Sequence, residues 1–373
     1  MVFVGGPRQV GKTVFARDVV GGRFSSVAFY NWDRLADRRN ALRCVWPGEA
    51  RLIVLDEYHK YPKWKNWLKG EFDTAGPERR FLLTGSARLN VYRKGGDSLQ
   101  GRYHYHTLFP FSVAELSGKR FSGIPGQPLT IGGESSEHGE LGELLKFGGF
   151  PEPFLRGEDR FWRRWNRERL ERFFQEDIRD LTRIRDLGSL ALLADLLPPR
   201  AGSVLSLNSL AEDLQVNFRT VSHWVEVFEN LYHCFRVSPY QTRQVAAVRK
   251  AKKLYLWDWS EISDPGHRLE NLVAVHLSKF STCLQESEGY DVRLHFLRDQ
   301  TGREVDFLLT ADGKPWIAVE VKASDEAPSR NLLYFKQCLA IPHAFQVCPK
   351  TGLDLEQQGV RRLSLDRFLA ALV

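Results

Sequence analysis

Residues 6–13 read GPRQVGKT and decide the fold of this chain. They have the form G-x-x-x-x-G-K-[ST] and directly follow Met1–Val4, an apolar run typical of a short buried strand. Glycines allow backbone N–H groups to close around phosphate oxygens, and a helix that begins behind the loop adds the positive end of its dipole. The stretch therefore predicts a phosphate-binding loop between a strand and a helix.

The side chains of this loop indicate which phosphate compound it binds. Lys12 is expected to reach the β- and γ-phosphates of a nucleotide, and the Thr13 hydroxyl is expected to bind Mg²⁺. The neighbouring positions supply backbone N–H groups and the first turn of the helix. The predicted nucleotide-binding residues of the loop are Gly6, Gln9, Val10, Gly11, Lys12, Thr13 and Val14. We therefore expect ATP and Mg²⁺ as ligands.

The composition narrows the class of protein. The 373 residues exceed one ordinary domain, so about two or three compact units are expected. The sequence contains no apolar stretch long enough to cross a bilayer and no recognisable secretory signal, so we expect a cytoplasmic protein without a membrane partner. Its five cysteines are scattered and odd in number, which argues against a disulfide framework. A formal net charge of +7 favours a polyanionic partner.

A second apolar run, residues 51–57 with the sequence RLIVLDE, ends in two acids. Such an unbroken run suits a parallel strand buried on both faces, and the carboxyl end of that strand faces the ligand crevice of an α/β sheet. Asp56 is expected to hold Mg²⁺ through water. Glu57 is the expected base for the water that attacks the γ-phosphate.

Two later stretches add candidate groups for the same site. The run 79–87 ends in small polar residues, of which Thr84 or Ser86 either orients the attacking water or senses the γ-phosphate, or simply forms a strand-terminal turn. Arg102 precedes a strand expected at 104–108 and has two interpretations. It contacts the γ-phosphate, within the chain or across the interface of a homo-oligomer, or it is a solvated surface group.

These motifs together resemble one large bacterial and archaeal AAA+-like P-loop ATPase family. The resemblance is carried by GPRQVGKT, LIVLDE, FLLTGSA, LQGR, FPFSVAEL at 109–116 and FGGFPEPF at 147–154. It extends over essentially the whole chain and implies that a winged helix and a restriction-endonuclease-like, PD-(D/E)xK domain follow the ATPase. Two features differ from the family pattern: only five residues precede Gly6, and Tyr58 follows the acidic pair.

Residues 207–224 have the pattern of a short helix, a tight turn and a second helix. Apolar residues of the second helix recur at helical spacing and are expected in the core: Val221, Trp224, Val225, Phe228 and Leu231. The remaining side chains near its N-terminal end face outward, where a recognition helix contacts DNA. These predicted DNA-binding residues are Arg219, Thr220, Ser222 and His223.

Strand-like runs at 233–240 and 252–258 would form the wing of a winged helix. The stretch that joins them carries Arg243, Arg249, Lys250, Lys252 and Lys253 without an acid. Of these, Arg249, Lys250 and Lys252 are predicted to lie along a phosphate backbone. Winged helices also serve as protein contacts or rigid spacers, and this alternative stays open.

The last third of the chain shows the order α-β-β-β-α-β of a three-layer α/β domain. Strand alternation places Asp306 on one strand, with Glu320 and Lys322 on one face of the next. Two carboxylates and a lysine can hold Mg²⁺ against a scissile phosphate. The D…E-x-K arrangement resembles the PD-(D/E)xK fold, and Glu270 on the leading helix matches the extra acid of that fold. A scaffold role without catalysis is the alternative.

We therefore predict an α/β chain with four parts: a P-loop ATPase domain (1–135, parallel sheet), a helical connector (136–190), a winged helix-turn-helix (191–260) and a PD-(D/E)xK nuclease-like domain (261–373). The predicted function is Mg²⁺-dependent ATP hydrolysis coupled to DNA binding and metal-dependent DNA cleavage. The alternative is a nucleotide-dependent switch whose last domain is a non-catalytic binding module.

Overall fold

A computed structural model describes residues 1–76, 78–86, 99, 101–119, 121, 123–132, 139–178, 184, 186–241 and 252–373. The chain forms two compact units. The first comprises Met1–Phe109, Leu170–Arg185 and Asn230–Tyr232, and the second comprises Pro110–Arg169, Asp186–Glu229 and His233–Val373.

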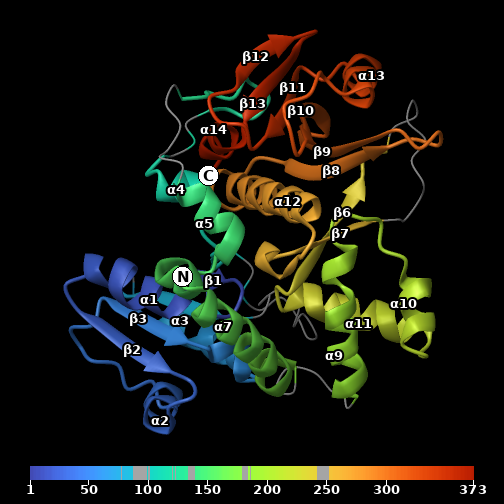
Figure 1. The fold of residues 1–373 in the computed structure, drawn as a ribbon. Helices are drawn as coiled ribbons and strands as arrows, with labels where there is room; N and C mark the ends of the chain where they lie inside the picture. Colours follow the sequence, from blue (N-terminus) through green and yellow to red (C-terminus); the bar gives the residue numbers. More distant parts are fainter. Residues whose placement is uncertain are drawn as a thin grey trace. The chain divides into compact units, whose positions relative to one another are not determined.

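The first unit is built on a five-stranded, fully parallel sheet (Figure 1). Its strands are β1 (Val2–Gly5), β2 (Val27–Asn31), β3 (Leu52–Asp56), β4 (Arg80–Gly85) and β5 (His104–Thr107), in the order β2-β3-β4-β1-β5. Because all strands run the same way, their carboxyl ends meet at one edge. β4 lies between β1 and β3, so the end of β4 adjoins both the loop after β1 and the acids after β3.

Both faces of this sheet are buried, which explains the unbroken apolar runs of its strands. Val4, Val54 and Leu82 pack with Ala16 on one face, whereas the alternate residues pack with α3 on the other. The helical elements are α1 (Lys12–Val14), η1 (Phe15–Val20), η2 (Gly21–Arg23), α2 (Leu35–Leu42), η3 (Tyr58–Lys60), α3 (Trp64–Thr74) and η4 (Phe173–Ile178).

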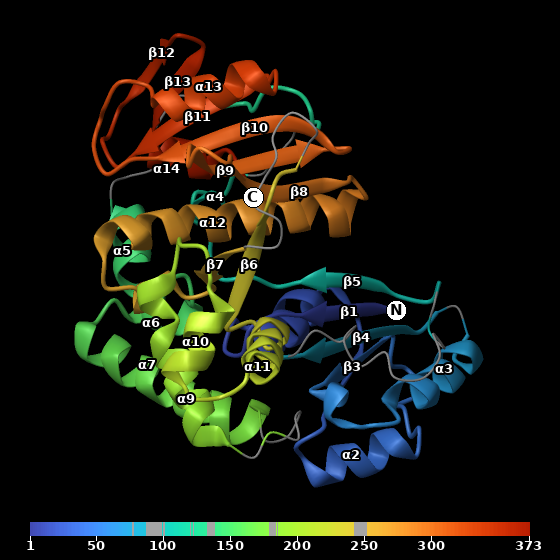
Figure 2. The same cartoon turned by 90° about the vertical axis from the view of Figure 1, so that its right-hand side faces the viewer.

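The second unit contains an eight-stranded mixed sheet in the order β12-β13-β11-β10-β9-β8-β6-β7. The strands are β6 (Cys234–Pro239), β7 (Lys253–Leu256), β8 (Val292–Arg298), β9 (Glu304–Ala311), β10 (Lys314–Val321), β11 (His343–Cys348), β12 (Asp354–Gln357) and β13 (Val360–Ser364). Figure 2 shows α12 (Pro265–Cys283) along one face of this sheet and α13 (Arg330–Cys338) on the other.

The remaining helical elements are given in chain order. They are α4 (Val113–Leu116), α5 (Gly139–Phe147), α6 (Pro151–Arg156), α7 (Asp159–Arg172), α9 (Leu187–Leu196), η5 (Pro198–Arg200), α10 (Leu207–Asp213), α11 (Phe218–Asn230), η6 (Trp259–Glu261), η7 (Leu284–Glu288) and α14 (Leu365–Ala370).

The observed units differ from the four predicted parts at two boundaries. β6 pairs in parallel with β8, so the boundary predicted after residue 260 falls inside one continuous sheet. Residues Pro110–Arg169 belong to the second unit, so the first continuous segment of the P-loop unit ends at Phe109 and does not reach 135. Both boundaries were predicted from local sequence patterns, and such patterns do not report strand pairing.

Apolar side chains at helical spacing (Trp165, Phe173, Ile178 and Leu181), with arginines and acids alternating around them, predict one helix from Phe161 to Asp186 that has opposite charges one turn apart. That helix is different in the structure. Its described part ends at Ile178, and Asp186 instead caps α9 by accepting a hydrogen bond from the Ser189 amide at 3.0 Å. Trp165, Phe173 and Ile178 are buried as predicted, whereas Leu181 lies outside the described residues. The ion pair expected one turn apart is present between Arg164 and Glu168 at 3.2 Å.

Candidate active site

The loop after β1 has the backbone that its glycines predict. Gly6 and Gly11 have φ values of +148° and +96°, and a Cβ on Gly6 would lie 2.2 Å from the Leu108 carbonyl oxygen. Only glycine fits at that position without moving β5's continuation. The amide of Phe15 donates to the Gly11 carbonyl at 2.8 Å, so the helix begins directly behind the loop.

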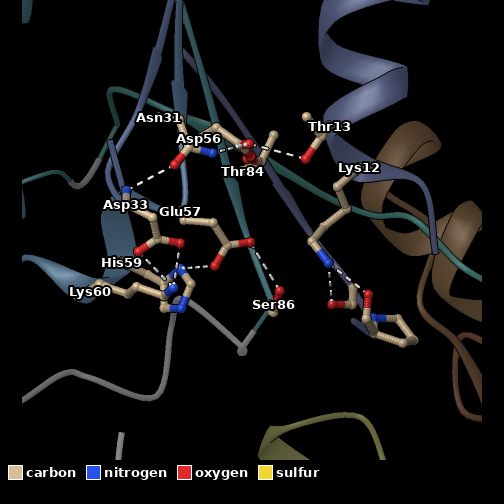
Figure 3. Close-up of polar contacts among 12 residues, drawn as sticks. Lys12, Thr13, Asn31, Asp33, Asp56, Glu57, His59, Lys60, Thr84 and Ser86 are labelled. Atoms are coloured by element: carbon tan, nitrogen blue, oxygen red, sulfur yellow. Dashed lines mark hydrogen bonds and ion pairs between the residues drawn. The ribbon is translucent and has the colours of Figure 1, made fainter. Parts of the chain in front are cut away.

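Lys12 lies inside this loop. Its side chain is buried, and its ammonium donates hydrogen bonds to the carbonyl oxygens of Gly6 at 3.1 Å and Pro7 at 2.6 Å (Figure 3). Among the other predicted loop residues, Val10 is buried and Val14 is exposed. The ammonium is therefore held at the position where the loop closes, as phosphate binding by this motif requires.

Asp56 is the centre of a buried hydrogen-bond network at the carboxyl end of β3 (Figure 3). Its Oδ2 accepts hydrogen bonds from the Thr13 hydroxyl and the Asn31 amide, both at 3.0 Å, and its Oδ1 accepts one from the Thr84 hydroxyl. Burial raises the pKa of Asp56, although these three donors oppose that shift. The structure thus brings together Thr13 and Asp56, the two residues predicted to share Mg²⁺, and a hydroxyl beside a carboxylate is a donor set that suits this ion.

Asn31 was not predicted as a site residue. It ends β2, and the parallel register places it directly beside Asp56 of β3. A polar residue at the end of a neighbouring parallel strand is the signal that points to it.

Glu57 lies next to this network and has a left-handed backbone, with φ 59° and ψ 21°. Its Oε1 accepts a hydrogen bond from the Ser86 hydroxyl at 3.1 Å, and its Oε2 lies 3.7 Å from Nδ1 of His59 (Figure 3). Burial lowers the pKa of His59 to about 4, although Glu57 opposes the shift, so the imidazole is neutral at physiological pH. A non-glycine residue in this conformation stores strain, which occurs often at functional sites.

Tyr58, one of the departures from the family pattern, anchors the strained turn. The side chain is fully buried and stacks on Trp67 with a centroid separation of 5.7 Å and an interplanar angle of 18°. Trp32 meets its edge at 5.2 Å. This aromatic packing fixes the backbone immediately after Glu57.

The sequence left open whether Thr84 and Ser86 act at the site or only form a strand-terminal turn. In the structure both side chains face the acids Asp56 and Glu57. Thr84 donates to Asp56 and Ser86 donates to Glu57, and both side chains are buried. They do so because β4 lies between β1 and β3. The two hydroxyls are therefore parts of the acidic site, whereas sensing of the γ-phosphate stays a prediction.

Arg102 does not lie at this site. Its guanidinium pairs with Asp73 of α3 through bonds of 2.8 and 3.2 Å, and its carbonyl accepts from the amino group of Met1. β5 runs parallel to β1, so Arg102 is at the edge where the strands begin, whereas the loop follows the edge where they end. Arg102 thus lies away from the phosphate-binding loop of its own chain, and its contact with the γ-phosphate, within the chain or across a subunit interface, stays a prediction.

A second group of acids lies in the sheet of the second unit. The antiparallel register that pairs Phe307 with Val319 places Asp306 opposite Glu320. Asp306 accepts a hydrogen bond from the Val321 amide at 2.9 Å, and Lys322 pairs with Glu320 Oε1 at 2.9 Å. The other oxygen of Glu320 is buried without a hydrogen-bond partner. A bare carboxylate oxygen beside a second carboxylate fits the predicted Mg²⁺ site.

Burial affects the ionisation of these acids. It raises the pKa of Glu320 to about 7, with the nearby charge of Asp306 adding to the shift. It also raises the pKa of Glu270 on α12 to about 7. Such perturbed carboxyl groups are typical of functional sites, although structural ion pairs also produce them.

Lys253 is the residue of this region that the sequence did not reveal. It was counted with the basic wing, but only 2% of its side chain is exposed. Its Nζ lies 2.7 Å from Glu304, 3.1 Å from Glu270 and 3.7 Å from Asp306. Burial favours a low pKa for Lys253, but the carboxylates outweigh it and raise the pKa above the usual value. Nothing in the local sequence distinguishes Lys253 from its neighbour, the exposed Lys252.

The helix pair has the predicted form. α10 and α11 are joined by a short turn, and the Asn217 side chain accepts a hydrogen bond from the Thr220 amide at 2.8 Å. The predicted core of α11 is buried. Arg219 and His223 are exposed one turn apart, whereas Thr220 and Ser222 are half-buried. Arg249 and Lys250, by contrast, lie outside the described residues.

Two features are absent from the described residues. No helix in these ranges has the length and apolarity needed to span a bilayer. No group of three or more histidine, cysteine, aspartate or glutamate side chains within the same ranges is arranged to hold a metal ion.

Three regions of the chain match known domain families. Residues 1–117 match the AAA domain family. Residues 138–260 and 265–368 match two domains of unknown function, DUF8612 and DUF4143.

Similarity to individual proteins extends over most of the chain. The uncharacterized protein MJ1544 of Methanocaldococcus jannaschii is 24% identical over 358 residues, which cover 90% of this chain and 77% of that protein. The uncharacterized proteins Mb2031c of Mycobacterium bovis and Rv2008c of Mycobacterium tuberculosis are each 23% identical over 348 residues, covering 89% of this chain and 72% of theirs. The N-terminal region is thus an AAA-like P-loop domain on a parallel sheet, which suggests an ATPase, and it precedes two regions similar to domains of unknown function.

Proposed function

We propose that the first unit hydrolyses ATP with Mg²⁺. The observation that carries this proposal is the hydrogen bond from Thr13 to Asp56, because it joins the end of the phosphate-binding loop to the acid at the end of β3. Bound Mg²⁺ would neutralise charge on the β- and γ-phosphates. Thr13 and Asp56 would hold it, the first directly and the second through water.

The other residues divide the remaining tasks. Lys12 exchanges the carbonyl oxygens that it now contacts for phosphate oxygens. Glu57 accepts a proton from the attacking water at a carboxylate oxygen. Ser86 fixes the orientation of Glu57, since its hydroxyl already donates to Oε1.

Substitution of the base tests this mechanism. Glu57→Gln keeps the shape of the side chain but cannot accept the proton, so ATP should still bind while turnover falls by about 10² or more. Lys12→Ala should lose ATP binding itself. Glu49→Gln is the matched control because Glu49 is exposed in the same unit. A Glu57→Gln protein that hydrolyses ATP at the parent rate contradicts the assignment.

We infer in addition that the second unit binds DNA and cleaves it with a divalent metal. This second function is favoured by Asp306 and Glu320 facing each other beside Lys322, with one Glu320 oxygen left bare. The exposed Arg219 on α11 supplies a positive charge for contact with DNA, and the exposed His223 lies one turn further along. ATP binding or hydrolysis would then control events on DNA.

Cleavage assays on linear, branched and supercoiled DNA, with and without ATP and Mg²⁺, test this function. Asp306→Asn should abolish cleavage. Asp312→Asn is the control because Asp312 is exposed in the turn between β9 and β10. If no DNA is cut under any condition, the nuclease function is wrong and the alternative of a nucleotide-dependent switch with a non-catalytic binding module holds.

A further inference from the structure

We propose that the ammonium group of Lys253 takes the place of a metal ion in the acidic site of the second unit. The site would then accept a single divalent cation, bound beside Glu320. This inference rests on the metal-binding role proposed for Asp306 and Glu320.

The first observation is the position of the ammonium. Lys253 extends from β7 and brings Nζ within ion-pair distance of three carboxylates, from Glu270 on α12 and from Glu304 and Asp306 on β9. Tyr255, two residues along β7, donates to the same oxygen of Glu270 at 2.8 Å. Acids from two different elements thus converge on one buried positive charge.

The second observation is that this charge excludes a metal from its own side. Mg²⁺ needs oxygen ligands at about 2.0–2.1 Å in a near-octahedral arrangement. The oxygens of Glu270 and Glu304 already contact the ammonium at 3.1 and 2.7 Å. A divalent ion among these oxygens would meet both the ammonium and its charge, so the lysine and a metal cannot share them.

The third observation is the contrast on the other side of Asp306. Glu320 has one oxygen paired with Lys322 and one that is buried without a partner. A buried bare carboxylate oxygen is costly, and binding a cation removes that cost. Asp306 lies between the two sides, since its Oδ1 faces Lys253 and its Oδ2 accepts from the Val321 amide.

Lys253 is also fixed in place. Its side chain is almost fully buried, and Nζ lies 5.6 Å from the centroid of the Phe296 ring. The backbone of β7 is held by its pairing with β6 and by a bridge between Lys253 and Val204. An ammonium group held this rigidly can replace a metal ion. Unlike a bound metal ion, it does not dissociate on dilution and is not removed by a chelator.

The experiment counts bound Mn²⁺ on the full chain without nucleotide, by calorimetry and by electron paramagnetic resonance. The parent carries Thr13→Ala so that the nucleotide site does not contribute. The parent should bind one Mn²⁺, and Glu320→Gln should lose it. Lys253→Met should bind a second Mn²⁺, because the oxygens released from the ammonium become available. Lys314→Met is the control, since Lys314 is exposed on β10, and should still bind one.

The outcomes separate this inference from the proposed function. Two ions bound by the parent overturn it directly, and that measurement needs no change at Lys253. One ion in the parent and one in folded Lys253→Met also overturns it. If Lys253→Met fails to fold, Lys253→Gln keeps hydrogen-bond donors without the charge and should bind the second ion. No ion in the parent contradicts the proposed metal site itself, and the resident-cation role of Lys253 is then wrong as well.

Discussion

The Thr13 hydroxyl donates a hydrogen bond to Asp56 Oδ2 across 3.0 Å, so that the end of the phosphate-binding loop and the end of β3 form one polar unit. Two segments 43 positions apart in sequence are joined by this bond. The AAA-like domain thus has its two predicted Mg²⁺ residues in contact before any ligand is considered.

Thr13→Ala should therefore weaken the response of ATP turnover to Mg²⁺. It removes a hydrogen bond to a buried carboxylate as well as the hydroxyl expected on the metal. Loss of a hydrogen bond to a charged group costs about 1.5–3 kcal/mol, which is roughly 10- to 150-fold in the apparent affinity for Mg²⁺. Thr13→Ser keeps the hydroxyl and should stay near the parent. The measurement is the ATP turnover rate as a function of Mg²⁺ concentration. Equal curves for Thr13→Ala and Thr13→Ser would show that the hydroxyl has no such role.

Gly6→Ala should distort the loop and abolish ATP binding. A Cβ there would lie 2.2 Å from the Leu108 carbonyl oxygen, on a backbone with φ +148°. Strain of this kind costs about 1–3 kcal/mol, so the melting temperature should also fall. Gly22→Ala is the control, because a Cβ on Gly22 meets nothing within 4 Å. Nucleotide binding by Gly6→Ala at the parent affinity would rule out this account of the loop.

The chain should lose stability in mild acid through His276. Its Nδ1–H donates to the Leu272 carbonyl at 2.8 Å, and its Nε2 accepts from the Val113 amide at 3.2 Å, so the ring is neutral. Burial lowers the pKa of His276 to about 4. Because the unfolded chain protonates this histidine near 6.5, the stability is complete above that pH and declines as the pH falls toward 4, by up to about 3 kcal/mol.

Urea unfolding at pH 7.5 and pH 5 measures this effect. His276→Gln cannot take up the proton, so its midpoint should shift less between the two pH values than that of the parent. His267→Gln on the same helix is the control, since His267 is exposed, and should shift as the parent does. An unchanged pH dependence in His276→Gln would refute the assignment.

Arg219→Glu should weaken DNA binding and its dependence on salt. Arg219 is exposed at the start of α11, with His223 one turn further along. Loss of one phosphate contact should reduce the salt slope of the binding constant by about 1. Fluorescence anisotropy across a salt titration measures it. Arg163→Glu, an exposed arginine on α7, has the same charge change and should retain the slope of the parent.

Much of the fold follows from local sequence patterns. The strands expected at 1–4, 51–57 and 104–108 and the helix pair expected at 207–224 lie close to β1, β3, β5, α10 and α11, and the order α-β-β-β-α-β of the last third is present as α12, β8, β9, β10, α13 and β11. The buried residues of α11 were predicted from their spacing. β12, β13 and α14 were missed, because β12 is short and half of its residues carry charge, so it lacks an apolar pattern.

Long-range strand pairing could not be read from these patterns. β6 and β7 pair antiparallel, as expected for the two strands of a wing, but β6 also continues the larger sheet through β8. The side chain of Lys253, counted with the basic stretch, lies among the acids of that sheet. Arg102 had two open interpretations, and only the strand order places it at the opposite edge of the sheet from the loop.

The sequence by itself determined the phosphate-binding loop, the acids at the end of β3 and the alternation of Asp306, Glu320 and Lys322, because each depends on chemistry repeated over a few neighbouring residues. Only the tertiary structure decided that Asn31 and Thr84 share Asp56, that Ser86 holds Glu57 and that Lys253 stands among three carboxylates. These contacts depend on strand order and on the reach of side chains across a sheet, and neither property is a function of local sequence.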